Sequence, residues 1–484
     1  MWSFVISVIA LILGYFLYGT FVDRVYGPDP FILTPAVTKA DGVDFMPLPT
    51  WKVFMIQFLN IAGTGPIFGA IMGAKFGPAA YLWIVLGCIF AGGVHDYMSG
   101  MFSMRSGGLS LPNVVEHLMG RGARHIVLVF SLILLLLVGT VFVYSPALIL
   151  GDIMGGGSKG AIMMWVLVIF AYYVLATLLP VDKIIVRIYP LFAFALLFMA
   201  FGLMVCLFVR WPDLPELWAG LDNLGPSVGL KGQRTIPCLF ITIACGAVSG
   251  FHSTQTPIMA RCLKNEKLGK PVFYGAMVTE GIVALIWAAV SSYFFFDGGA
   301  VEVGSNLSAQ APEVVMKVAS AWLGIAGGVL AILGVVAAPI TSGDTAFRSA
   351  RLIIADSMHF DQKHRRNRLV VALPVFAAAC LLLWYNIADE NGFNVIWRYF
   401  GWANQSLAAL VLWCAAIYFK TRRNNRSYLI AFVPAFLLTV IVVSYICMEK
   451  IGFSLPYGVS IAIGVVVALL LSAGFFLRRH YIQK

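Results

Sequence analysis

The sequence predicts an all-α protein that crosses a membrane about thirteen times. Of its 484 residues, 60% are hydrophobic and 11% are charged, whereas soluble domains carry roughly 25% charged residues. Such an apolar chain cannot cover its surface with polar groups, so we expect lipid to surround it. Glycine and proline interrupt two of the apolar stretches at matching positions, which predicts an internal repeat.

Each predicted span is an apolar stretch of about 20 residues, the length needed to cross the hydrocarbon core. The first stretch lacks a basic segment before it and a small-residue cleavage site, so we interpret it as a retained helix and not as a secretory signal. The eight cysteines form no CxxC pair, and we expect them to be buried packing residues. The predicted spans are 3–21, 51–74, 79–103, 126–150, 161–180, 188–209, 235–260, 271–296, 318–345, 369–386, 393–419, 427–447 and 455–477.

The distribution of basic residues predicts the orientation of these spans. Of the 33 Lys and Arg residues, 25 lie in one set of alternate loops and the other 8 lie in the opposite set. Because Lys and Arg accumulate on the cytoplasmic side, we expect the amino terminus outside the cell and the carboxyl terminus in the cytoplasm. The net charge of +11 therefore reflects topology, and we expect no nucleic-acid partner.

The second predicted span is interrupted near its middle by Gly63, Thr64, Gly65 and Pro66. Proline lacks an N–H and clashes with the preceding turn, and glycine adds backbone freedom, so we predict an unwound segment halfway across the membrane. The seventh predicted span carries a similar interruption over 246–257, where two glycines precede a polar run and a proline. Either interruption alone could be a packing notch or a kink.

Irregular backbone at membrane depth is stable only where it is buried in protein or lines a cavity. Its free N–H groups attract anions, and its free carbonyl groups bind cations. We therefore expect the substrate to bind at the two interruptions. The candidate substrate-binding residues are Gly63, Thr64, Gly65, Ser249, Gly250, His252, Ser253, Thr254 and Gln255.

The two interruptions also define a repeat. Five predicted spans lie in residues 51–210 and five lie in 235–420, and each set begins with an interrupted helix. Since five is odd, the second set is inverted relative to the first, which is typical of secondary transporters. The predicted division is completed by residues 1–50, an N-terminal helix and a cytoplasmic loop, and by 427–484, two C-terminal helices and a cytoplasmic tail.

Three of the 22 acidic residues lie inside predicted spans, namely Asp96, Glu280 and Asp344. A charge at mid-membrane costs about 2.5–3.5 kcal/mol, so such residues face a bundle interior or a wet cavity. Asp96, beside His95, could relay protons or hydrogen-bond a neighbouring helix, and Glu280 could carry a proton or remain neutral on a backbone partner. Asp344 precedes Arg348 by four residues, which favours an ion pair along one helix. We take Asp96, His95 and Glu280 as candidates for proton or ion coupling.

Polar residues also occur near the ends of later spans. Thr341 and Ser342 follow Pro339, and adjacent hydroxyl groups can bind a small cation or donate back to their own helix. Asn404 and Gln405 are a weaker candidate pair in the eleventh predicted span.

Five segments of the chain stand out as motifs: Gly42-Val43-Asp44-Phe45-Met46-Pro47, Asn60–Pro66, Phe76-Gly77-Pro78, Gly93-Val94-His95-Asp96-Tyr97 and His252–Pro257. They resemble the motifs of the carbon starvation protein A family, and the similarity covers most of the chain, as in a short family member. The resemblance implies uptake of peptides or pyruvate across the bacterial cytoplasmic membrane, driven by an ion gradient and induced by carbon starvation.

The arrangement also resembles the leucine-transporter fold, with spans two to eleven as its core. In that fold a sodium ion lies between the first and eighth core helices. Pro66 stands where its amino-acid transporters have a hydrogen-bond donor, so the chain departs from their carboxylate contact at this position. The sodium ligands that this resemblance implies are the carbonyl groups of Leu59, Ala62 and Ala338 and the hydroxyl groups of Thr341 and Ser342.

Two other classes of function fit the sequence less well. An intramembrane aspartyl protease using Asp96 and Asp344 would need a Gly-x-Gly-Asp signature, but Thr341 precedes Ser342-Gly343-Asp344, and a zinc protease would need HExxH. A non-transporting receptor would bind a nutrient without flux. The chain has no Walker A motif, so ATP does not drive it directly. We expect no enzyme and no cofactor, with Na⁺ or H⁺ as coupling ion, pyruvate or a peptide as substrate, and the lipid bilayer as partner.

Overall fold

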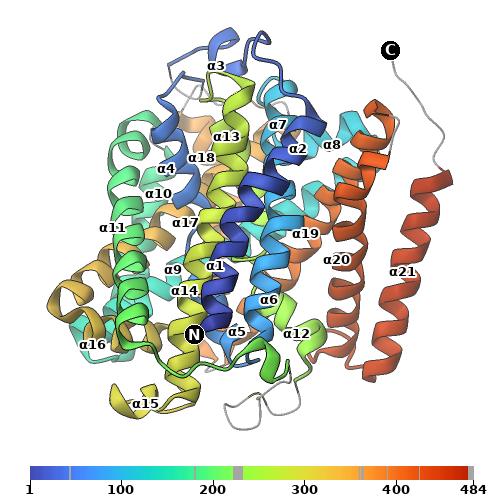
Figure 1. Cartoon of the computed structure of the whole chain (residues 1–484). Helices are drawn as coiled ribbons and strands as arrows, with labels where there is room; N and C mark the ends of the chain where they lie inside the picture. Colours follow the sequence, from blue (N-terminus) through green and yellow to red (C-terminus); the bar gives the residue numbers. More distant parts are fainter. Residues whose placement is uncertain are drawn as a thin grey trace.

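The computed structural model describes residues 1–42, 45–178, 181–221, 230, 233–358, 360, 365–389, 391–423 and 426–477. The predicted cytoplasmic tail, 478–484, lies outside this range, as do Val43 and Asp44 of the first motif. The described chain is built of helices that run between the two ends of a single bundle (Figure 1).

Eleven helical segments are each long and apolar enough to cross a membrane, and a pair of helices bent by 49° forms a twelfth. The eleven segments are Trp2–Tyr26, Ala79–Arg105, Arg121–Gly155, Lys159–Ala176, Tyr189–Arg210, Glu266–Phe296, Gly328–Met358, Arg366–Ala388, Gly392–Thr421, Arg426–Met448 and Tyr457–Leu477. The bent pair is Thr50–Ile61 and Gly65–Ala74.

The first segment is a helix with one π-helical turn, and short helices lie in the loops. The segment consists of α1 (Trp2–Gly14), η1 (Tyr15–Gly19) and α2 (Thr20–Tyr26). The predicted first repeat contains α4 (Thr50–Ile61), α5 (Gly65–Ala74), α6 (Ala79–Leu86), η2 (Gly87–Gly92), α7 (Gly93–Arg105), α9 (Arg121–Gly155), α10 (Lys159–Leu178) and α11 (Val181–Arg210). The short loop helices include α3 (Pro35–Thr38), α8 (Leu111–Met119) and α15 (Gly299–Glu302).

The predicted second repeat follows the same order, and two further helices complete the chain. The second repeat contains α12 (Thr235–Thr242), α13 (Gly250–Ala260), η5 (Lys270–Tyr274), α14 (Gly275–Phe296), α16 (Ala311–Ala331), η6 (Ile332–Val336), α17 (Ala337–Met358), α18 (Arg365–Ala388) and α19 (Gly392–Arg423). The last two helices are α20 (Leu429–Met448) and α21 (Tyr457–Leu477).

The predicted count of about thirteen spans treats α12 and α13 as one crossing. Residues 243–249 separate them, and neither helix is long enough to cross alone. Figure 1 shows α12 near the lower end of the bundle and α13 near the upper end, so the two half-helices together pass through it. Helix α1 starts at the lower end and α21 finishes at the upper end, as an odd number of crossings requires.

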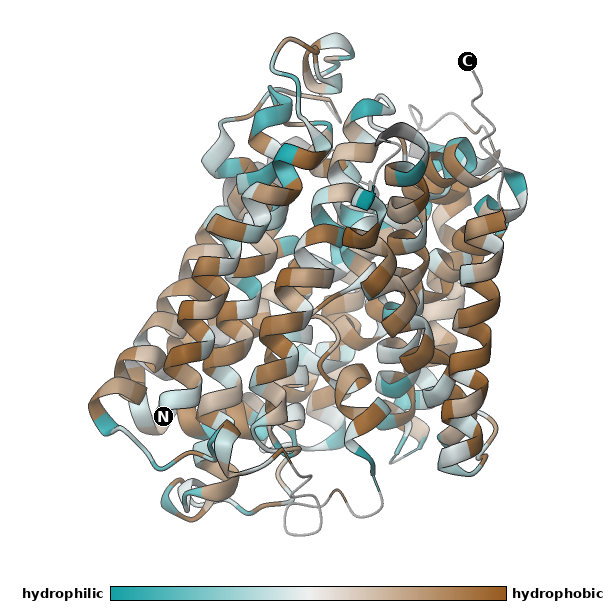
Figure 2. Ribbon diagram, turned by 45° about the vertical axis from the view of Figure 1, so that its right-hand side comes forward, coloured by the Kyte–Doolittle hydropathy of each residue, from teal (hydrophilic) through white to brown (hydrophobic). Residues whose placement is uncertain are grey.

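Burial separates inner helices from outer ones. The most apolar window of the α19 segment is 89% buried and that of the α14 segment is 83% buried, whereas the values for α1 and α21 are 22% and 28%. Figure 2 shows hydrophobic residues over the middle of the bundle and hydrophilic residues mainly at its two ends. The polar residues at mid-depth therefore lie on the inner helices, away from lipid.

Candidate functional site

The first interruption separates α4 from α5. Pro66 lies in the first turn of α5, where its missing N–H costs nothing. The same missing N–H leaves the carbonyl of Ala62 without its partner in a continuous helix. The N–H of Gly63, which would bind Leu59 in that helix, donates instead to Ile61 at 3.0 Å. Two carbonyl groups at mid-membrane are thus released from helical pairing.

The second interruption occupies residues 243–249, earlier than the predicted 246–257. The polar run and Pro257 lie within α13 instead. The reason is a cap from another helix, because Asn404 of α19 accepts hydrogen bonds from the Ser249 hydroxyl at 3.1 Å and from the Phe251 N–H at 2.8 Å. These bonds satisfy donors at the start of α13 and fix where the helix begins.

The two interruptions lie against each other. A Cβ atom on Gly65 would lie 2.4 Å from Sγ of Cys245, and one on Gly69 would lie 2.8 Å from the Thr242 carbonyl oxygen. A Cβ on Gly246 would lie 3.7 Å from Cα of Pro66. Only glycine allows this approach, so the crossing depends on the absence of side chains. The C-termini of α4 and α12 and the N-termini of α5 and α13 meet there.

All nine candidate substrate-binding residues are buried at or beside this crossing. The hydroxyl of Ser253 donates to Gly250 and that of Thr254 donates to Phe251, each at 2.6 Å, so both bond back to their own helix. Among the described residues, the hydroxyl of Thr64 has no partner. Thr64 is therefore the member of this group best placed to bind a ligand.

Four titratable side chains lie next to one another in a row beside the second interruption. Asp96 on α7 contacts Nδ1 of His95 at 2.8 Å and Nδ1 of His252 at 2.8 Å. The other ring nitrogen of His252, Nε2, lies 3.4 Å from Oε2 of Glu280 on α14 without forming a hydrogen bond. All four side chains are fully buried. The sequence predicts that His252 binds substrate, whereas the structure places it against Asp96 and Glu280, two of the three coupling candidates.

The geometry of these four side chains suits proton movement. If both Nδ1 atoms donate to Asp96, the neutral form of His252 presents an unprotonated Nε2 toward Glu280. A protonated Glu280 could then pass its proton to His252 after a small side-chain rotation. Two buried carboxylates beside neutral imidazoles would be costly, so the group is most stable with a proton on Glu280 or on an imidazole.

Four of the five predicted cation ligands pair with one another. The hydroxyl of Ser342 donates to the Leu59 carbonyl at 2.9 Å, and that of Thr341 donates to the Ala338 carbonyl at 2.8 Å. A Cβ on Gly63, next to Ala62, would lie 3.4 Å from the Ser342 hydroxyl. Oxygen atoms of α4 and α17 thus converge beside the first interruption, and hard oxygen ligands of this kind fit a small cation.

Asp344 has a different environment. Its carboxylate lies 3.5 Å from Arg348, which confirms the predicted contact along one helix, and it accepts a hydrogen bond from Tyr189 at 3.1 Å. Asp344 is therefore paired with Arg348 and Tyr189, and these contacts are separate from those of Asp96 and Glu280.

Two buried amides on α4 were not singled out from the sequence. Gln57 and Asn60 are fully buried, and their side chains have no hydrogen-bond partner among the described residues. Their spacing of three residues places them on one face of α4, just before the interruption. The signal was two amides in an apolar span, but such residues are also common in helix packing.

Comparison with known proteins identifies the family. Residues 1–164, 157–326 and 299–445 match the family model described as carbon starvation protein CstA. The chain belongs to the CstA family. This family consists of membrane transporters, so the chain is a multi-pass member of a bacterial transporter family and not an enzyme.

Several curated proteins are similar to this CstA-family chain. An uncharacterised membrane protein of Haemophilus influenzae is 45% identical over 61% of this chain and 91% of its own length. The peptide transporter CstA of Escherichia coli is 28% identical over 90% of this chain and 79% of its own length. The pyruvate/proton symporter BtsT of E. coli is 29% identical over 60% of this chain and 49% of its own length.

Solved structures show the same fold. A mutant of the Eremococcus coleocola manganese transporter superposes with a TM-score of 0.54 at 14% identity, covering 90% of this chain and 97% of that one. MhsT in complex with L-phenylalanine gives a TM-score of 0.54 at 12% identity, covering 88% and 97%. These likenesses confirm the predicted leucine-transporter fold.

Proposed function

We propose that this chain is an ion-coupled secondary transporter that imports a small carboxylate-bearing solute, pyruvate or a short peptide, across the bacterial cytoplasmic membrane. The proposal agrees with the names of its relatives, which include peptide transporters and a pyruvate/proton symporter.

The crossing of the two interrupted helices carries this proposal. Helices α5 and α13 both begin at mid-membrane, so the positive ends of two helix dipoles face the same buried region. Such ends favour an anionic group, and a carboxylate is common to pyruvate and to free peptides. The unpartnered side chains of Gln57, Asn60 and Thr64 supply further polar groups on α4 and the adjoining interruption.

Two features could couple the solute to an ion. The chain of His95, Asp96, His252 and Glu280 could hold a proton, and the oxygen cluster around Ser342 could hold sodium. We favour the proton, because the four titratable groups are buried together at the second interruption, next to the proposed carboxylate site. Binding of solute and ion would then shift the first two spans of each repeat relative to the others.

Uptake into proteoliposomes tests this function. Proton and sodium gradients are imposed separately, and labelled pyruvate, dialanine and trialanine are offered in turn. We expect accumulation of at least one solute under an inward proton gradient. Binding without accumulation would indicate a receptor, and neither binding nor accumulation would contradict the proposal.

A further inference from the structure

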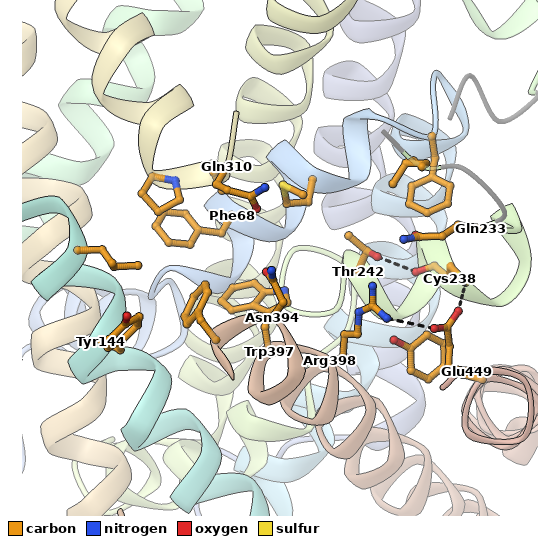
Figure 3. Close-up of a pocket in the computed structure, with 18 residues that line it drawn as sticks. Phe68, Tyr144, Gln233, Cys238, Thr242, Gln310, Asn394, Trp397, Arg398 and Glu449 are labelled. Carbon is orange, nitrogen blue, oxygen red and sulfur yellow. Dashed lines mark hydrogen bonds and ion pairs between the residues drawn. The ribbon is translucent and has the colours of Figure 1, made fainter. Parts of the chain in front are cut away.

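A cavity of about 310 Å³ lies between the α5 and α12 half-helices and the start of α19 (Figure 3), on the side of the crossing that we predict to face outward. It is distinct from the nine residues assigned to the substrate, none of which lines it. Six of its eighteen lining residues are aromatic, and two, Arg398 and Glu449, are charged. The aromatic residues are Phe68, Phe76, Tyr144, Phe393, Trp397 and Tyr445.

The two charges form one ion pair. Nη1 of Arg398 lies 3.3 Å from Oε2 of Glu449, and Oε1 of Glu449 accepts from the Cys238 thiol at 3.5 Å (Figure 3). The Arg398 side chain is 40% exposed and that of Glu449 is 15% exposed. Because the pair uses one guanidinium nitrogen, Nε and Nη2 of Arg398 retain donors with no partner among the described residues. Asn394, one turn earlier on α19, also lines the cavity.

A guanidinium with spare donors binds a carboxylate through two parallel hydrogen bonds. The aromatic wall adds apolar contact for whatever the carboxylate carries. A bound solute and Glu449 would compete for the same cation, since the cavity is lined by a single positive charge among the described residues.

We infer that this cavity is an outward-facing receiving site for the carboxylate of the solute, with Arg398 as its ligand and Glu449 as an internal competitor. The inference rests on the proposed function and adds a binding step before the crossing is reached. A series of ring contacts leads inward from the cavity, because Trp397 packs on Phe400, Phe400 on Phe142, and Phe142 against Gly63 of the first interruption.

Two variants with opposite expected effects test the inference. Arg398→Gln removes the ligand and should raise the KM for uptake by roughly ten- to a hundredfold, the range for a charge-assisted hydrogen bond. Glu449→Gln removes the competitor and should lower the KM by roughly two- to fivefold, as expected for a partly exposed pair. If the pair only braced α19 against α20, both variants would impair uptake alike, and this result would overturn the inference.

A matched control and separate probes complete the experiment. Arg210 pairs with Glu302 at the same end of the molecule and is also 40% exposed, so Arg210→Gln should leave the KM unchanged. Pyruvate, dialanine and dialanine amide are compared, because an amidated carboxyl group should lose the dependence on Arg398. Binding to the purified protein, measured as a thermal shift, is recorded for every variant. Uptake by the wild type with no effect of Arg398→Gln overturns the receiving site alone, whereas no uptake and no shift with any probe overturns both proposals.

Discussion

His252 presents its two ring nitrogens to carboxyl groups on different helices, Asp96 on α7 and Glu280 on α14. An imidazole in this position can accept a proton at one nitrogen and release one at the other. A histidine that only braced helices would need one such partner. Their mutual contacts explain why Asp96, His252 and Glu280 are tolerated at membrane depth, where each group alone would be costly to bury.

Replacing these groups should uncouple transport from protons. We expect His252→Gln and Glu280→Gln to lower proton-driven accumulation by roughly 5- to 150-fold, the usual size of a coupling between two bound ligands. Exchange of labelled for unlabelled solute at equal pH should persist, because the backbone at the crossing is unchanged. Proteoliposome uptake and exchange measure the two effects, and His117→Gln, an exposed histidine, is the control. Full proton-driven accumulation in both variants would contradict the relay.

The hydroxyl pair on α17 gives an independent prediction. Thr341→Ala together with Ser342→Ala removes two of the five proposed cation ligands. If sodium binds there, the double variant should lose any stimulation of uptake by sodium, because the remaining carbonyl groups are too few to replace its hydration shell. Uptake over a series of sodium concentrations is the measurement. Thr140→Ala on α9, where the hydroxyl donates to Leu136 of its own helix, is the matched control, and retained stimulation in the double variant would contradict a sodium site here.

The sequence was sufficient to find the residue types in the site but not their partners. Asp96 and Glu280 are conspicuous because they are charged residues in apolar spans. Their connection through His252 depends on helix rotation and packing, which no local pattern encodes. Likewise, Arg398 and Glu449 lie 51 residues apart in the chain and meet only when α19 packs against α20.

At the level of helices, the crossing of α4–α5 with α12–α13 depends on small residues. Pro66, Gly63 and Gly65 predicted the first interruption correctly, because each has a local conformational effect. The second was misplaced by a few residues, because Pro257 is accommodated inside α13 while Asn404 of a distant helix caps the true start.

Adding a side chain at Gly65 should lower the stability of the protein and its uptake activity. Gly65→Ala places a Cβ 2.4 Å from Sγ of Cys245, and we expect a loss of about 1–3 kcal/mol in stability, as for other overpacked cores, with reduced uptake. Cys245→Gly in the same chain removes the clash and should restore both in part. Thermal unfolding in detergent and proteoliposome uptake measure the effects. Gly122→Ala, with no neighbour within 4 Å, should be neutral, and an equal effect of the two alanine variants would contradict the close crossing.

For the whole molecule, hydrophobicity and the two repeated interruptions were sufficient to predict the fold class. The thirteen apolar stretches all correspond to helical segments, since twenty apolar residues in lipid must satisfy their own hydrogen bonds. Helix ends were less well predicted, because α9 extends from Arg121 to Gly155, beyond the predicted 126–150. Polar end residues can continue a helix past the membrane, which hydropathy does not register.

The orientation can be tested directly. With the amino terminus outside and thirteen crossings, a fluorescent protein fused after Leu477 should fold in the cytoplasm and fluoresce. Alkaline phosphatase at the same position should be inactive, whereas alkaline phosphatase inserted at Gly304, after α15, should be active. The reverse pattern at both positions would mean the opposite topology. An active phosphatase at both positions would mean an even number of crossings.

The Leu59–Ser342 contact joins α4 to α17, whereas Asp96, His252 and Glu280 all lie on the first two spans of the two repeats. If those spans move as one body during transport, as proposed above, the oxygen atoms of α4 and α17 would separate, whereas Asp96, His252 and Glu280 would keep their contacts with one another. Sodium would then be released by the movement itself, whereas a proton would stay bound until water reached the site. An engineered disulfide between α4 and α17 should consequently prevent the release of sodium and leave proton exchange unchanged.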